Sequence, residues 1–207
     1  NGLMISRDGG GHWVRAHGGL PPVSVNDIKI KDGDLVLGTY GRGIMIMDDV
    51  GFLPRFTGDV MESAAHLFPI REAEQYYRNN RTPSNRAARF AGPNPEYGAL
   101  ITYYLKDPPT TSDSSEAPEV AIQILDSEGT VIRELTGPDR PGVNRIAWDL
   151  RRIQPEPEAE GTAQGQEEEE ERRQRLVDVD PGAYMVRLMA RGMELTRGVT
   201  VVPDRRR

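Results

Sequence analysis

ISRDGGGHW, residues 5–13, places an acidic residue, three consecutive glycines and a tryptophan close together. Glycine tolerates the positive φ that a tight link between two strands needs, and the Asp8 carboxylate can accept hydrogen bonds from backbone N–H groups of such a turn. A phosphate-binding loop would need a helix after the glycines, and the WVRAHGG that follows has no helical pattern. The stretch therefore predicts a structural turn, with Ser6 bonding the turn backbone and Trp13 packing against a neighbouring sheet.

Short apolar runs divided by glycine turns fill residues 1–50, which indicates antiparallel β-structure. In VNDIKIK (25–31), Asn26, Ile28 and Ile30 share one face of the pleat, which predicts a half-buried strand. Asp32-Gly33 and Gly41-Arg42-Gly43 have the composition of hairpin turns. The expected strands are GLMIS (2–6), WVRA (13–16), VNDIKI (25–30), DLVLGTY (34–40) and GIMIMDD (43–49).

Residues 1–50 also repeat, because NGLMISRDGG and RGIMIMDDVG share one pattern at a separation of about 40 residues, a period typical of propeller blades. The first copy carries Ser6, Asp8, Gly10 and Trp13 at all four fixed positions of the Asp-box (BNR) pattern Ser-x-Asp-x-Gly-x-x-Trp. DLVLGTYGRGIMIMDD resembles the Gly-Thr-x-Gly-Arg-Gly hairpin and Asp-Asp pair of bacterial sortilin-like and glycosyl-hydrolase-like BNR propellers. The resemblance implies that 1–50 form the last one to two blades of a β-propeller, with Asp-boxes as structural turns away from the ligand site.

The clearest alternation of apolar and polar residues lies between residues 99 and 203. In NRIAWDLRR (144–152), Ile146, Trp148 and Leu150 face one way, and in AYMVRLMARG (183–192) alternate residues from Tyr184 to Ala190 point inward. Several such strands predict an immunoglobulin- or fibronectin-like β-sandwich, and the resemblance implies one after the propeller. The other expected strands are ALITYYLKD (99–107), EVAIQILD (119–126), TVIREL (130–135) and LTRGVTVVP (195–203), with DSEGTVIREL as a hairpin.

Three further segments have distinct compositions. Residues 51–98 are polar, Arg-rich and interrupted by prolines, which predicts a linker or packing arm; Tyr76 and Tyr77 would otherwise suit stacking on nucleic acid or glycan. Residues 153–176 combine prolines with a block of five glutamates, which predicts a disordered acidic insertion within the sandwich. An acidic tether for a cation or basic partner is the alternative, and residues 204–207 form a basic tail.

Composition excludes several classes of protein. The formal net charge of −6 disfavours nucleic-acid binding, and no run reaches the ~18 to 20 apolar residues of a membrane-spanning helix. The chain has no cysteine, so disulfide and thiolate chemistry are absent. It opens without Met, so we expect a fragment whose upstream blades pair with it, and the family implies an extracellular or periplasmic location.

The candidate chemistry is sparse. His12, His17 and His66 lack metal-ligand spacing, so neither a metal nor a cofactor is predicted. Adjacent residues of a strand point to opposite faces, which makes Asp48-Asp49 a poor acid–base pair for glycoside hydrolysis. Asp27 and Asp49 remain candidate catalytic carboxylates facing a propeller channel. Arg42 is a candidate for binding a carboxylate or sugar, with bonding of turn carbonyls as its alternative.

Two functions remain open. The first is a non-catalytic C-terminal portion that closes the propeller and adds a β-sandwich for stability or for binding a glycan or protein. The second is part of an extracellular glycoside hydrolase whose catalytic carboxylates lie mostly upstream. The absence of a convincing acid–base pair favours the first, and a fold does not establish a reaction.

Overall fold

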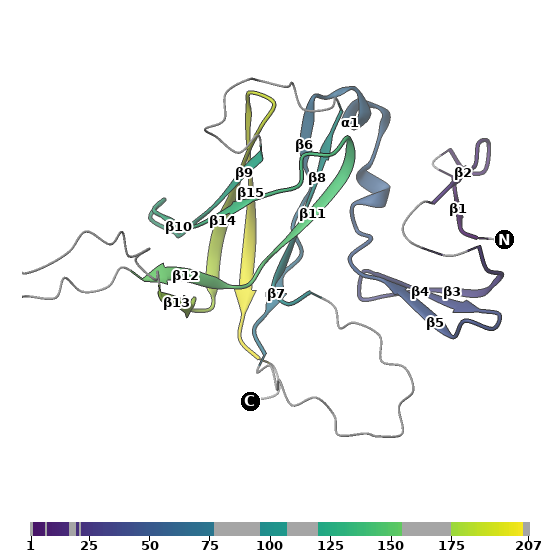
Figure 1. The fold of residues 1–207 in the computed structure, drawn as a ribbon, viewed down its shortest axis with the longest axis horizontal. Helices are drawn as coiled ribbons and strands as arrows, with labels where there is room; N and C mark the ends of the chain where they lie inside the picture. The colour runs from purple at the N-terminus through teal and green to yellow at the C-terminus, as the bar shows by residue number, and fades with distance from the viewer. Residues whose placement is uncertain are drawn as a thin grey trace, which may run out of the picture.

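The computed structural model describes residues 2–6, 8–16, 20, 22–76, 96–106, 120–154 and 175–204. Almost all regular structure in these residues is β-strand, which confirms the all-β class (Figure 1). No helix in this part of the chain has the length and apolar character needed to cross a membrane.

Two sheets sharing one core form the larger part of the molecule, here called the two-sheet unit. Strands β10, β9, β14, β15 and β7 lie in that order in one sheet, and β11, β8 and β6 form the other. All their pairings are antiparallel except β15 with β7, which is parallel. The strand bounds are β6 Ala65–Leu67, β7 Ala73–Glu74, β8 Ala99–Leu105, β9 Val120–Leu125, β10 Val131–Thr136, β11 Gly142–Trp148, β14 Gly182–Ala190 and β15 Met193–Val202.

The core of the two-sheet unit follows the predicted alternation. Val186, Leu188 and Ala190 of β14 are buried, while Met185 on the opposite face is exposed, which confirms the expected inward face. Tyr103 of β8 is also fully buried. Its hydroxyl donates to the carbonyl of Pro138, and burial raises the pKa of this phenol well above its usual value. The buried hydroxyl thus stays neutral and has a hydrogen-bond acceptor, as a buried polar group requires.

The expected strand 144–152 is wrong as a single element. It divides into β11 and β12 (Arg151–Gln154), because Leu150 takes a positive φ of 57° that extended backbone cannot accommodate. β12 pairs with β13 (Arg175–Asp178) in a separate ribbon. Leu150 itself stays buried, and its carbonyl accepts from the Val179 N–H at 2.9 Å. Residues 155–174, most of the predicted acidic insertion, lie outside the described residues.

The five expected strands of residues 1–50 are all present. β1 (Met4–Ile5) and β2 (Val14–Arg15) form the Asp-box hairpin, while β3 (Val25–Lys31), β4 (Asp34–Thr39) and β5 (Ile44–Met47) form the N-terminal sheet. Both predicted hairpin turns are confirmed by their positive φ values, 52° and 86° at Asp32 and Gly33 and 78° and 70° at Gly41 and Gly43. A second, smaller core packs one face of this sheet and is made of Leu3, Leu35, Leu37 and Val50.

The prediction that β3 is half-buried is wrong in this chain. Ile28 and Ile30 are 51% and 73% exposed, although they share a face with the buried Leu35 and Leu37 through the antiparallel register. The reason is position, because β3 is an edge strand that pairs only with β4 among the described residues. The small core covers the centre of that face and stops short of the edge.

The expected linker contributes strands to the two-sheet unit. It begins with η1 (Leu53–Arg55) and α1 (Gly58–Glu62), then supplies β6 to one sheet and β7 to the other. Beyond β7, residues 77–95 lie outside the described residues, with Tyr77 and most of the AGPNPEYG turn. The segment 51–76 therefore connects the N-terminal sheet to both layers of the two-sheet unit (Figure 1).

Arginines join the N-terminal sheet to the two-sheet unit. Arg145 of β11 donates from Nη1 to the carbonyl of Asp48 at 2.8 Å and from Nη2 to that of Asp49 at 2.6 Å. Its Nε donates to Thr102 Oγ1 at 3.0 Å, and its guanidinium carbon lies 5.8 Å from the centre of the Phe52 ring. One side chain thus holds the segment after β5 against the two-sheet unit.

A second arginine bonds the β3–β4 turn, which lies next to this segment. Arg71 donates from Nη1 to the Asp32 carbonyl at 2.7 Å and to Asp34 Oδ1 at 2.9 Å. The same Asp34 oxygen accepts from the Asp49 N–H at 2.8 Å. The β3–β4 turn is therefore bonded both to the chain leaving β5 and to the chain entering β7.

Candidate functional site

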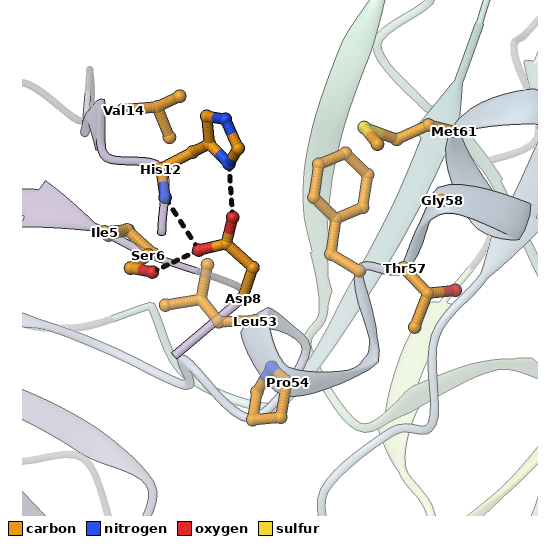
Figure 2. A pocket seen from close by; sticks show the side chains of 11 residues that line it. Ile5, Ser6, Asp8, His12, Val14, Leu53, Pro54, Thr57, Gly58 and Met61 are labelled. Carbon is orange, nitrogen blue, oxygen red and sulfur yellow. Dashed lines mark hydrogen bonds and ion pairs between the residues drawn. The ribbon is translucent and has the colours of Figure 1, made fainter. Parts of the chain in front are cut away.

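The turn of the Asp-box hairpin is closed by side chains of the motif itself (Figure 2). Asp8 Oδ1 accepts from Ser6 Oγ at 2.9 Å and from the His12 N–H at 2.8 Å, while Asp8 Oδ2 lies 2.5 Å from His12 Nδ1. Ser6 Oγ also accepts from the Gly10 N–H at 2.7 Å. Positive φ at Gly9 and Gly10, 71° and 103°, lets the chain reverse within this short span.

The charge state of Asp8 follows from these bonds. The backbone N–H of His12 lowers the pKa of the Asp8 carboxyl most, the His12 and Ser6 side chains add to this, and the pKa falls from 3.8 to about 2. A carboxylate with such a low pKa is a poor general base. Both of its oxygens are also already used within the turn.

The serine and histidine do not form a hydrolytic triad. In a triad the serine hydroxyl bonds to histidine, which the acid orients from its other nitrogen. Here the Ser6 and His12 side chains both bond to Asp8, on different oxygens, so the serine donates to a weakly basic carboxylate and not to the histidine. The sequence analysis considered His12 only as a possible metal ligand and rejected it, and it missed this contact, which the i,i+4 spacing across a glycine turn could have suggested.

The prediction that Trp13 packs against a neighbouring sheet is wrong for the described residues. Its indole is 59% exposed, and its Nε1 donates to the Gly10 carbonyl at 3.0 Å. The correction has a physical reason, because β1 and β2 pair only with each other in the part of the chain that the structure describes. No described sheet lies where the indole could be covered.

A cavity of about 750 Å³ lies beside the Asp-box hairpin, between it and the segment of η1 and α1 (Figure 2). Asp8 and His12 lie at its polar edge, and Met61 lies across from them. The other lining residues are Ile5, Ser6, Val14, Leu53, Pro54, Phe56, Thr57 and Gly58. Its walls are mainly apolar, and its acidic group is engaged in the turn, so the geometry provides a surface recess without acid–base machinery.

The two candidate carboxylates are not brought together. Asp27 lies near the start of β3, where its Oδ1 accepts from the Ile28 N–H at 2.9 Å. Asp49 follows β5 at the other end of the N-terminal sheet, beside Asp34. Lys31 follows Asp27 by four residues on β3 and pairs with Asp34, the residue beside Asp49. Four residues span about 13 Å at the usual rise of a strand. This exceeds the ~5 to 9.5 Å between paired glycosidase carboxyls.

Asp49 instead lines an acidic cavity of about 520 Å³ at the junction of the N-terminal sheet and β7. Asp32, Asp34, Asp48 and Arg71 line it too, and Arg71 bonds the β3–β4 turn there. Asp49 also has a positive φ of 46°. Its backbone carbonyl and N–H both serve the junction.

Arg42 lies at the β4–β5 hairpin tip, the end of the sheet that also holds Asp27, and it is exposed. The turn around it is closed by Thr39, whose N–H and Oγ1 both donate to the Gly43 carbonyl. Sequence reasoning missed Arg71 and Arg145, the arginines that engage backbone carbonyls across the junction. No local pattern marks them, because their acceptors are distant in the chain.

Metal binding finds no support in the described residues, among which no group of three or more His, Asp or Glu side chains is placed to hold an ion. His17 lies outside them.

No protein-family model, curated protein or solved structure matches the chain.

The Asp8 carboxyl gives a direct test of the hairpin's bonding. We expect its carboxyl ¹³C resonance to titrate with a midpoint near 2 in the folded chain and near 3.8 in the urea-unfolded chain. A depressed folded pKa stabilises the hairpin above pH 3.8, and this stabilisation is lost as the pH falls to about 2. A folded-state midpoint near 3.8 would show that the bonds to Ser6 and His12 do not form in solution.

Proposed function

We propose that this chain is the non-catalytic C-terminal portion of a secreted Asp-box propeller protein. In this proposal the Asp-box hairpin is the outer half of one blade, the N-terminal sheet is most of the next, and the two-sheet unit is an accessory β-sandwich. Its partners are upstream blades of the same protein, and the ligand of the whole propeller protein is a glycan or another protein. The proposal rests on the Asp-box motif, the sequence repeat within residues 1–50 and the exposed apolar residues of the N-terminal sheet.

The observation that carries the proposal is that the N-terminal sheet exposes isoleucines on both faces. Ile28 and Ile30 belong to the face of Leu35 and Leu37, whereas Ile44 and Ile46 belong to the other face, with Val36 and Gly38. Ile44 and Ile46 are 72% and 61% exposed. An antiparallel sheet that stands alone has one apolar and one polar face. Apolar residues on both faces fit a sheet stacked between two neighbours, as a propeller blade is.

The junction supports an accessory role for the two-sheet unit. Arg145 bonds the backbone after β5, and Arg71 bonds the β3–β4 turn at the same end of the N-terminal sheet. Such contacts hold a terminal blade in one orientation against the sandwich. The two candidate carboxylates at opposite ends of the sheet favour the non-catalytic role over glycoside hydrolysis.

Hydrogen exchange tests the proposal. In the 207-residue chain we expect amides of residues 25–47 to exchange much faster than those of residues 182–202, because the small sheet has exposed isoleucines on both faces. In a longer chain that includes the upstream coding sequence, the amides of 25–47 should become protected.

The control is the two-sheet unit, whose protection should be the same in both chains. Strong and uniform protection of residues 25–47 in the 207-residue chain would contradict the proposal. So would a longer chain that leaves their exchange unchanged.

A further inference from the structure

A pocket on the two-sheet unit is lined by no residue of the Asp-box hairpin or the N-terminal sheet in the described part of the chain. It has a volume of about 540 Å³ and is formed where the ends of β7 and β15 lie side by side, next to the turn between β13 and β14 (Figure 1). Its lining includes Tyr76 and Tyr97 together with three acidic residues, Asp178, Asp180 and Asp204. We call it the tyrosine–aspartate pocket. Its size falls in the range of about 300–1,000 Å³ typical of ligand sites.

The two tyrosines give the pocket an aromatic wall. Their rings meet edge to face, with centroids 4.9 Å apart at 90°. Tyr97 packs against the main core, so it is held in place, while Tyr76 is 47% exposed. The exposed face of an aromatic ring attracts a cation through its quadrupole.

The charged residues that line the pocket in the described part of the chain are all acidic: three carboxylates line it, and no described lysine or arginine does. Arg151 lies just outside, with its Nε 3.2 Å from Asp178 Oδ1. Asp180 and Asp204 complete the acidic rim. Aromatic surface beside several carboxylates is complementary to a cation, and most of all to the flat guanidinium, which stacks and forms forked bonds to carboxylates.

Hydrogen bonds within the chain hold three of the four contributing segments together. The Gln75 N–H donates to the Val202 carbonyl at 2.9 Å, and Gln75 Nε2 donates to the Val179 carbonyl at 2.6 Å. Tyr184 Oη donates to the Asp180 carbonyl at 2.7 Å. The walls are thus fixed before binding, which lowers the entropic cost of capturing a ligand.

We propose that the tyrosine–aspartate pocket binds arginine side chains of a basic peptide or protein segment. The guanidinium stacks on Tyr76 and faces the carboxylate of Asp180. All of the pocket's residues lie outside residues 2–50, so this proposal stands or fails independently of the propeller assignment.

The test is a calorimetric titration of the full chain with a blocked tetrapeptide that contains two arginines. We expect saturable binding that weakens as salt is raised, because the ion pairs are solvent-accessible and screened. The same peptide with citrulline, which keeps the shape and removes the charge, should bind at least about tenfold more weakly.

Two variants test the assigned side chains. Tyr76→Ala and Asp180→Asn should each weaken binding of the arginine peptide by about three- to tenfold. Tyr40→Ala and Asp59→Asn are the matched controls, since Tyr40 and Asp59 are exposed on the N-terminal sheet and on α1, and neither should change binding. Circular dichroism verifies that each variant is folded.

Several results would overturn the proposal. These are no binding of the arginine peptide to the wild-type chain, equal binding of the citrulline peptide, or unchanged affinity in both Tyr76→Ala and Asp180→Asn. Binding of a neutral oligosaccharide that is lost in Tyr76→Ala, without binding of the arginine peptide, would identify a glycan site instead.

Discussion

Replacing Trp148 by alanine is expected to lower the free energy of unfolding by about 3–5 kcal/mol, the usual cost of removing a large aromatic side chain from a core. Trp148 is fully buried, and its ring centroid lies 5.3 Å from that of Tyr184. Its Nε1 donates to the Arg151 carbonyl at 2.9 Å. The substitution therefore leaves a cavity between the sheets and removes the donor that ties β12 to the end of β11.

Trp13 is the matched control, because it is the other tryptophan of the chain and is mostly exposed. We expect Trp13→Ala to change the free energy of unfolding by no more than about 0.5 kcal/mol in the 207-residue chain. Urea unfolding followed by far-ultraviolet circular dichroism measures both variants without relying on tryptophan emission. Equal losses in the two variants would contradict the assignment of Trp148 to the core.

The strands were predictable from the sequence because their signals are local. Alternation identified β14 and its inward face, and Asp-Gly and Gly-x-Gly turns marked both hairpins of the N-terminal sheet. The break of the strand at Leu150 was not predictable, because leucine carries no signal for a positive φ. Tertiary contacts, including the Val179 N–H on the Leu150 carbonyl, hold it there.

The prediction that β3 is half-buried was wrong for a different reason. Alternation in VNDIKIK shows which residues share a face, but it does not show whether anything covers that face. Ile28 and Ile30 are exposed since β3 lies at an edge.

The sites were the least predictable part. The side chains that meet at the tyrosine–aspartate pocket come from four segments, next to β7, β8, β15 and the β13–β14 turn, that are distant in the sequence. The motif residues, by contrast, lie within one turn. Local patterns therefore identified Ser6 and Asp8 and gave no indication of Asp180 or Arg145.

Arg145→Met is the substitution expected to separate the two parts of the molecule. Methionine keeps much of the aliphatic length and removes the guanidinium. The carbonyls of Asp48 and Asp49 and the hydroxyl of Thr102 then lose their charged donor. A hydrogen bond to a charged group contributes about 1.5–3 kcal/mol. These contacts are only partly buried, so we expect a total loss of about 2–3 kcal/mol.

The region that loses stability shows whether Arg145 joins the two parts of the molecule or stabilises the molecule as a whole. If Arg145 holds the N-terminal sheet to the two-sheet unit, amides of residues 34–47 should exchange about 30- to 140-fold faster, the equivalent of 2–3 kcal/mol. Amides of β9 and β14 should exchange at nearly their original rates. The matched control is Arg152→Met, because Arg152 is exposed on β12 and its replacement should leave both regions unchanged. Faster exchange spread evenly over both regions would place Arg145 in the general stability of the two-sheet unit, and unchanged exchange would mean that the N-terminal sheet is held without it.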